Sequence, residues 1–553
     1  MSENENAIPV YWFNRKIQVS WLLLLTCLTF FMRLNYGELH LMEARNFITA
    51  KEMIQNGNWL IPTMNGQLRL AKPPLPTWLT ALSGLAAGNI ENVAALRFPA
   101  ACMAVLLVFF LYALASQLTS DKLIPFLSAL VLSTSLLFVV VGRQGTWDIY
   151  CHSFMAGAIW LLVKGLKIPK INYWTFLLCG VLAGLSFLSK GPVSFYVLLL
   201  PFVAAYIICY GPLDFKNNAR GLLTAFLACV LVSGAWPLYI YLNEPVSLTQ
   251  NVSNESSAWL NRHVKPIWFY WGFVFQSGIW AILALATFVV PYAKPRIGRF
   301  GNYRFLISWV IITFLLLSVI PEKKERYLLP VLIPLALLTA HYLRYLSVSL
   351  PEKKFARWDL GLTVFTFMLI ALITFAAPGV IYFFAFRQLL ISGLSLSFIT
   401  ILFWTFTSLI IYYFLKRKFI NLYILAALVN VSIMLTFIPL YQDILYPKVN
   451  YQSLRNTRNI KEVKTLPFYA LYGLPLEHVW EVGKRVDTLQ VINRQVKPIP
   501  KLPAAIFSPE PLAPYFPDRN IQLKQMATFH YSREDPDKTL YLFLVSSLPE
   551  SGK

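Results

Sequence analysis

The chain alternates between long apolar stretches and short polar loops, and this pattern predicts membrane-spanning helices. A helix needs about 20 consecutive apolar residues to cross the hydrocarbon core of a bilayer. About thirteen stretches meet this requirement, which predicts an all-α polytopic membrane protein. The predicted spans are 17–35, 97–118, 122–141, 147–165, 173–189, 191–210, 221–241, 268–291, 303–320, 327–345, 358–377, 395–415 and 419–440.

The long polar loop between the first two spans departs from this pattern. An amphipathic helix is predicted over 39–56, because the apolar residues Phe47, Ala50 and Ile54 are three and four positions apart, which is helical spacing. A second apolar helix, predicted at 77–87, is too short to cross the bilayer. These two helices either frame a site at the outer interface or simply lie on the membrane surface.

The chain changes character from about residue 442, where polar residues and prolines become frequent. A predicted helix at 474–486 precedes short β-rich runs, which indicates a small α/β domain. The runs are TLQVI at 488–492, AAIF at 504–507 and TLYLFLV at 539–545. We therefore predict a membrane domain over 1–441, which includes the first outer loop at 36–96, and a C-terminal domain over 442–553.

The charges of this chain are few and unevenly placed. Of 553 residues, 57% are hydrophobic and 13% are charged, with a formal net charge of +22. Most Lys and Arg lie in every second loop, which is typical of loops that stay in the cytoplasm. This distribution places the N-terminus in the cytoplasm and the C-terminal domain on the opposite side. Because the cations are accounted for by membrane topology, the net positive charge does not indicate a nucleic-acid partner.

Several cations nevertheless fall on the outer side, where topology does not favour them. Cations held there imply an anionic partner, for which a lipid phosphate is the expected candidate. Lys190 as a helix cap and Arg326 as a snorkelling residue are structural alternatives. The outer cations are Arg45, Lys72, Arg143, Lys190, Arg262, Lys265, Lys323, Lys324 and Arg326.

Two acidic residues are candidates for chemistry. Asp148 opens an apolar helix, where a carboxylate is costly unless it has a partner or a function. Its structural alternative is an ion pair with Arg143. Glu43 lies on the first predicted surface helix. Either carboxylate could serve as a general base while nearby cations stabilise a departing phosphate.

A metal site is not predicted, although a divalent metal is left open. His40 and His263 have no third His or Cys at ligand spacing. The six cysteines lie in or beside apolar spans and match no metal-binding pattern.

The order of several motifs resembles the bacterial GT-C glycosyltransferases, in particular the family of the lipid A aminoarabinose transferase and the protein O-mannosyltransferases. These motifs run from the first outer loop to the tenth predicted span. They are NGNWLIPTMNGQLRLAKPP (56–74), RQGTWD (143–148), GLSFLSKGP (184–192) and RYLLPVLIPLALL (326–338). The resemblance implies a GT-C fold of about thirteen transmembrane helices with a small periplasmic C-terminal domain.

The resemblance also implies roles for individual residues. Lys72 matches a lysine that binds the donor phosphate, and Arg262 a phosphate-binding arginine in a later loop. Glu43 and Arg45 match residues of an acidic motif in the first loop, whose preceding aspartate is here Met42. This departure leaves Glu43, Glu38 and Asp148 as candidate bases. The donor phosphate and its lipid would contact Arg45, Lys72, Arg143, Arg262, Lys323, Lys324, Arg326 and Tyr327.

The function that the resemblance implies is transfer of a monosaccharide from a polyprenyl-phosphate donor to lipid A or another envelope glycolipid. The transfer would take place at the periplasmic face of the bacterial inner membrane. An alternative acceptor is a Ser or Thr of a secreted protein. A lipid transporter and an inactive lipid-binding homologue, the latter suggested by Met42, are further alternatives.

Overall fold

The chain forms two compact units in the computed structural model. The structure describes residues 8–168, 170–211, 215–445, 451–492, 495–498, 500–516, 520–532, 535 and 537–547. One unit comprises Met1–Asn35 and Leu70–Phe437, and the other Tyr36–Arg69 and Ile438–Lys553. Residues 36–69 therefore fold with the C-terminal residues, a grouping that differs from the predicted domain boundaries.

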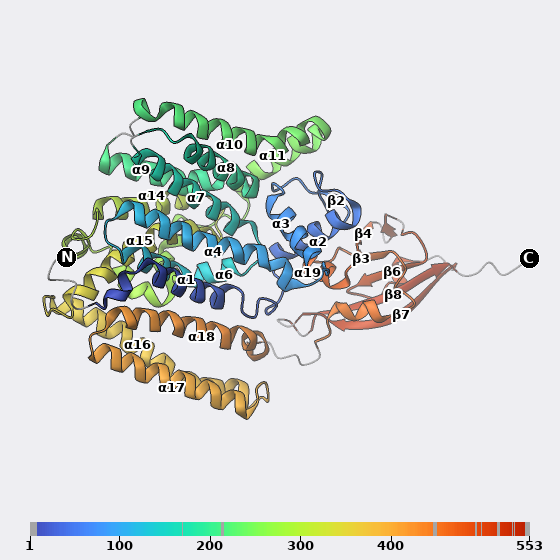
Figure 1. Ribbon diagram of the computed structural model, residues 1–553. Coiled ribbons are helices and arrows are strands. Elements are labelled where there is room, and N and C mark those ends of the chain that lie inside the picture. Colours follow the sequence, from blue (N-terminus) through green and yellow to red (C-terminus); the bar gives the residue numbers. More distant parts are fainter. Residues whose placement is uncertain are drawn as a thin grey trace, which may run out of the picture. The chain divides into compact units, whose positions relative to one another are not determined.

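The first unit consists of helices, the longest of which run side by side in Figure 1. Its α-helices are α1 (Arg15–Phe30), α3 (Leu75–Ala86), α4 (Val93–Leu118), α5 (Ile124–Ser133), α6 (Leu136–Gly142), α7 (Trp147–Lys167), α8 (Tyr173–Lys190), α9 (Leu200–Tyr210), α10 (Phe215–Asn243), α11 (Pro245–Asn261), α12 (Ala281–Ala286), α13 (Val290–Ile297), α14 (Tyr303–Val319), α15 (Leu329–Ser349), α16 (Arg357–Ile381), α17 (Gly393–Leu415) and α18 (Phe419–Leu445), the last of which continues into the second unit. Shorter 3-10 or π segments are η2 (Val10–Phe13), η3 (Phe195–Leu199), η4 (Ile267–Trp280), η5 (Glu325–Leu328) and η6 (Tyr382–Phe386).

Among the described residues, nine helices are long and apolar enough to cross a membrane, which makes this a multi-pass membrane protein. The consecutive helices α5 and α6 form one further span if their 66° bend is counted within it. Shorter apolar helices occupy Phe195–Tyr210 and Tyr303–Val319. Each predicted span thus coincides largely with helix, whereas the number thirteen is not confirmed.

Helix α15 is the core of the first unit. Nearly every residue from Leu329 to Ser349 is buried, as expected for a helix that is apolar on all sides. Most of α10 and α17, in contrast, is exposed, so these helices face lipid. The segment that enters α15 therefore has a fixed position in the unit.

A short backbone pairing fixes the loops at one end of these helices. Val264, after α11, pairs antiparallel with Glu322, which lies between α14 and α15. The Lys265 amide donates to the Pro321 carbonyl at 3.2 Å, and the Lys323 amide to the His263 carbonyl at 3.2 Å. The end of α11 is thereby held against the segment that enters α15.

At the other ends of the helices, one buried carboxylate joins three of them. Asp359, in the first turn of α16, is fully buried. Arg296 of α13 donates to it at 2.7 Å, and the Tyr345 hydroxyl of α15 at 3.0 Å. The Ala356 amide adds a third contact at 3.0 Å. A buried carboxylate with this many donors holds its neighbours in place, because removing one partner leaves the others without compensation.

The second unit is an α/β domain with a six-stranded sheet in the order β5-β4-β3-β6-β8-β7. Strand β3 is parallel to β4 and to β6, and the remaining neighbours are antiparallel. Its elements are α2 (Leu41–Asn56), β1 (Thr63–Met64), β2 (Gln67–Leu68), η7 (Leu454–Asn459), β3 (Phe468–Leu471), α19 (Leu476–Val482), β4 (Val486–Ile492), β5 (Gln495–Lys497), β6 (Ala504–Ser508), η8 (Ala513–Tyr515), β7 (Ile521–His530) and β8 (Thr539–Ser547). The predicted C-terminal helix and the three β-rich runs are confirmed.

The predicted first surface helix is confirmed as α2, and it packs onto α19 within the second unit. The rings of Phe47 and Trp480 lie 5.7 Å apart, and Lys51 donates to the Gly483 carbonyl at 2.8 Å. The side chain of Asn65, in the β1–β2 turn, donates to the Val486 carbonyl at 2.7 Å. These contacts explain why residues 36–69 fold with the C-terminal residues.

We expect Asp359→Asn to lower the free energy of unfolding by about 3 kcal/mol, because the substitution leaves the Arg296 guanidinium without its charged partner. Chemical unfolding of the protein in detergent micelles measures this loss. Glu352→Gln is the matched control, since the partner of Glu352, Lys354, is 73% exposed and the pair is worth less than about 1 kcal/mol. Equal stability of the two variants would contradict the role of Asp359.

Candidate active site

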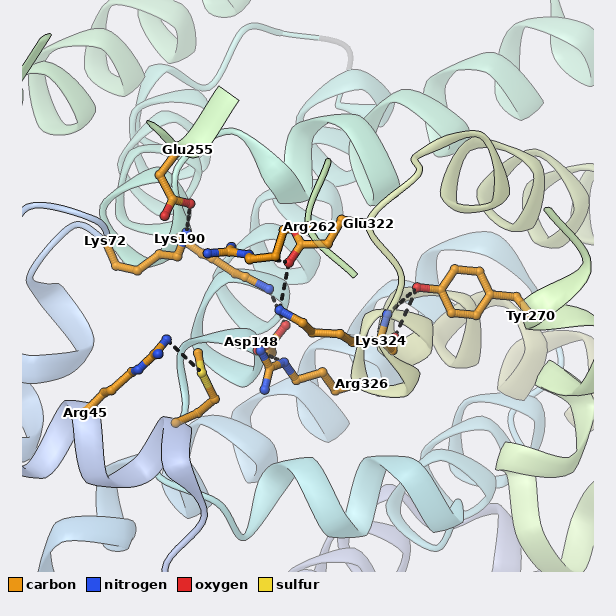
Figure 2. Close-up of polar contacts among 11 residues, drawn as sticks. Arg45, Lys72, Asp148, Lys190, Glu255, Arg262, Tyr270, Glu322, Lys324 and Arg326 are labelled. Atoms are coloured by element: carbon orange, nitrogen blue, oxygen red, sulfur yellow. Dashed lines mark hydrogen bonds and ion pairs between the residues drawn. The ribbon is translucent and has the colours of Figure 1, made fainter. Parts of the chain in front are cut away.

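Ion pairs gather at one end of the helices of the first unit. Among the described residues, ion pairs join five cations to three carboxylates, which leaves an excess of two positive charges. We call this group the charge cluster (Figure 2). Its members are Lys72, Lys190, Arg262, Lys324 and Arg326 with Asp148, Glu255 and Glu322.

The most buried part of the charge cluster centres on Asp148, in the first turn of α7. Lys190, the last residue of α8, forms an ion pair with its Oδ1, and Arg326 of η5 lies 3.5 Å from its Oδ2. Asp148 and Lys190 are 3% and 9% exposed. The predicted alternative pair with Arg143 is therefore wrong, and Asp148 instead joins the ends of α7, α8 and the segment before α15.

The more exposed part contains three further ion pairs. Lys72 contacts Glu255 of α11 at 2.7 Å. Glu322 accepts from Lys324 at 2.7 Å and from Arg262, which follows α11, at 3.3 Å. Exposure rises from 3% at Asp148 to 23% at Lys72, 25% at Lys324 and 44% at Arg262. A ligand from outside would therefore meet these last three cations first.

The electrostatics of the outer residues follow from burial and charge. Burial lowers the pKa of the Lys72 ammonium, and the Glu255 carboxylate opposes this effect. Burial alone would raise the pKa of Glu322, but the hydrogen bond and charge of Lys324, together with Arg262, bring that pKa below its ordinary value. Glu322 is therefore ionised at neutral pH.

Aromatic residues support the loop that carries Lys324 and Arg326. The Tyr270 hydroxyl accepts from the Lys324 amide at 3.0 Å and donates to the Lys324 carbonyl at 3.1 Å (Figure 2). The ring of Tyr327 lies 4.5 Å from the Lys190 ammonium, and the charged groups of Lys324 and Arg326 lie within 6 Å of the same ring. Tyr327 is thus a shared aromatic neighbour of three cations of the charge cluster.

Two predicted phosphate-binding residues have other partners. Arg143 donates to the Thr29, Met32 and Arg33 carbonyls at 2.6, 2.8 and 3.0 Å. It therefore closes the end of α1, whose last carbonyls lack helical donors. The Lys323 ammonium donates to the Ile320 carbonyl at 2.5 Å. Within the described part of the chain, neither side chain forms a hydrogen bond or an ion pair with a member of the charge cluster.

The remaining predicted residues belong to the second unit. The Glu43 carboxylate accepts the His40 amide at 3.3 Å, while the His40 ring accepts the Met42 amide at 3.2 Å, so the pair caps α2. Glu43 is 1% exposed, and Glu38 is exposed in the loop before α2. The Arg45 guanidinium lies 3.7 Å from the Met42 sulfur.

Sequence reasoning missed Glu255 and Tyr270. A single glutamate in a polar helix carries no local signal that it faces Lys72, which is far away in the sequence. Tyr270 lies in an aromatic run typical of a membrane interface. For a metal, the described part of the chain offers no group of three or more His, Cys, Asp or Glu side chains that could hold an ion.

Comparisons with known proteins show what this chain resembles in sequence and in fold. Residues 71–237 match the family described as dolichyl-phosphate-mannose-protein mannosyltransferase. The undecaprenyl phosphate-α-4-amino-4-deoxy-L-arabinose arabinosyl transferase 2 of Proteus mirabilis is 26% identical over 313 residues, 54% of each chain. Transferase 1 of Pseudomonas fluorescens is 26% identical over 308 residues, 54% of this chain and 52% of its own. The chain spans about half the length of these curated relatives.

The fold extends the likeness beyond the matched sequence. The crystal structure of ArnT from Cupriavidus metallidurans bound to undecaprenyl phosphate aligns with a TM-score of 0.70 and 13% identity, over 96% of this chain and 97% of that one. At this identity the likeness concerns the fold. The predicted resemblance is thereby confirmed: this multi-pass membrane protein is similar in sequence to the mannosyltransferase family over residues 71–237 and to the arabinosyl transferases over about half of its length, and similar in fold to ArnT.

Proposed function

We propose that this protein transfers a monosaccharide from a polyprenyl-phosphate donor to lipid A or another envelope glycolipid. The transfer takes place at the periplasmic face of the bacterial inner membrane, with the N-terminus in the cytoplasm and the C-terminal domain in the periplasm. The observation that carries this proposal is the charge cluster, whose two excess positive charges lie at the ends of membrane-spanning helices. The sequence relatives support the donor class, since their names specify undecaprenyl phosphate.

The reaction explains the charge of the cluster. An acceptor oxygen attacks the anomeric carbon, and the bond from that carbon to the phosphate oxygen breaks. A donor phosphodiester carries one negative charge, whereas the departing polyprenyl phosphate carries up to two. Cations placed where charge develops lower the barrier most. Direct displacement of this kind inverts the anomeric centre.

The cations divide this work between them. Lys72, Arg262 and Lys324 are the more exposed and would contact the phosphate. Lys190 and Arg326 lie behind them on Asp148 and add charge without direct contact. Asp148 has a cation at each of its two oxygens, so we assign it to holding these cations rather than to accepting a proton.

The contacts of the candidate bases indicate which chemical class of acceptor the site would use. Asp148, Glu255 and Glu322 are ion-paired, Glu43 caps its own helix and position 42 is Met. A phosphate group on a glycolipid is already ionised near neutral pH and needs no base, whereas a Ser or Thr hydroxyl does. We therefore favour a phosphate-bearing glycolipid as acceptor. The alternative acceptor, a hydroxyl of a secreted protein, would require a general base.

Lys72→Ala tests the phosphate assignment. We expect kcat/KM for a radiolabelled polyprenyl-phosphate sugar, with lipid A as acceptor, to fall about 10²- to 10³-fold, because one donor to the developing charge is lost. Lys524→Ala, at an exposed lysine of β7, is the matched control and should stay within about twofold. Unchanged turnover in Lys72→Ala would refute this assignment.

Glu43→Gln tests whether Glu43 is a base or a helix cap. We expect a lower melting temperature with kcat reduced less than about tenfold, because loss of a cap costs roughly 1 kcal/mol whereas loss of a general base costs about 10²- to 10⁴-fold. A 100-fold fall in kcat in a folded variant would instead favour a general base and hence the hydroxyl acceptor.

The acceptor class is tested with the unsubstituted protein. We expect label to reach phosphorylated lipid A but not dephosphorylated lipid A, and label on a secreted protein instead would favour the hydroxyl acceptor.

A further inference from the structure

Helix α11 directs one face at the segments that carry the phosphate-binding cations. Asn251 and Glu255 are four residues apart, a spacing that places them on one side of the helix, and Arg262 directly follows the last residue of α11. The Asn251 amide donates to the Leu70 carbonyl at 2.9 Å, which holds α11 against the segment that carries Lys72. Glu255 contacts Lys72 at 2.7 Å (Figure 2).

Glu255 pairs with the Lys72 ammonium, the group that would bind the donor phosphate. The Lys72 ammonium is largely buried and gains from an anionic partner, which Glu255 supplies. A phosphate is an anion of the same kind, and two anions on one ammonium repel each other. Binding of a phosphate at Lys72 therefore requires the Glu255 carboxylate to move away.

We propose that Glu255 competes with the lipid phosphate for Lys72 and thereby helps to expel the polyprenyl phosphate product. This inference rests on the proposed function. Repulsion scales with charge, so the carboxylate disfavours a dianionic product about twice as strongly as a monoanionic donor. Glu255 is thus a positioning residue. It lowers the affinity of Lys72 for phosphate, whereas the charge cluster as a whole attracts the phosphate.

Binding of geranylgeranyl phosphate to the detergent-solubilised full-length protein tests this exchange. We expect Glu255→Gln to tighten the Kd about tenfold, because the competing charge is removed. Binding of geranylgeraniol, which lacks the phosphate, should not change. Glu255→Asp keeps the charge and should keep the original affinity. Glu244→Gln, at the start of α11, removes the same charge away from Lys72 and should leave both affinities unchanged.

Turnover separates this role from a merely structural one. In Glu255→Gln the first turnover should proceed normally, while steady-state kcat and donor KM both fall because product release becomes slower. Weaker or unchanged phosphate binding in Glu255→Gln, beside normal binding in Glu255→Asp, would overturn the exchange and leave the proposed function standing. Failure of the unsubstituted protein to bind geranylgeranyl phosphate would overturn the proposed function itself.

Discussion

Mutual repulsion among clustered cations is the constraint on which this site depends. Five ammonium and guanidinium groups lie together at the ends of membrane-spanning helices, where the surroundings screen charge less than water does. Three carboxylates offset part of this repulsion, and the ring of Tyr327 lies among three of the cations. The remaining excess positive charge supports the proposal that the site binds an anion, and it has the sign that a departing phosphate requires.

The fold brings these groups together by aligning helix ends. Asp148 begins α7, Lys190 ends α8, and Arg326 lies just before the buried helix α15. The backbone pairing between Val264 and Glu322 fixes the loop after α11 against the same segment. Because side chains at the ends of rigid helices keep their positions, the cations are ordered before a ligand arrives, which is the condition for electrostatic stabilisation of a transition state.

Much of this arrangement could be predicted from the sequence. The features that could not be predicted depend on contacts between segments that are distant in the sequence. Apolar length located the spans. The predicted placement of Lys72, Arg262, Lys324 and Arg326 on the outer side, where topology disfavours cations, singled them out as candidates, and the structure joins all four to the charge cluster. Ion pairs between distant segments leave no local pattern, so the partner of Lys72, Glu255, was not found. Arg143 is likewise a cation predicted on the outer side, but its guanidinium donates to backbone carbonyls at the end of α1. Tertiary contacts of α2 likewise placed residues 36–69 with the C-terminal sheet.

Phosphorus NMR tests the central claim most directly, because the reaction converts a phosphodiester donor into a phosphate monoester. Purified protein would be mixed with a polyprenyl-phosphate sugar, first alone and then with lipid A. The account predicts a stable donor phosphodiester signal without acceptor. When lipid A is added, the donor phosphodiester signal should give way to that of the polyprenyl phosphate monoester, while a phosphate monoester signal of lipid A gives way to a new phosphodiester signal. A donor phosphodiester signal that persists with lipid A, and with a secreted protein in its place, with no polyprenyl phosphate monoester formed, would contradict glycosyl transfer from this donor.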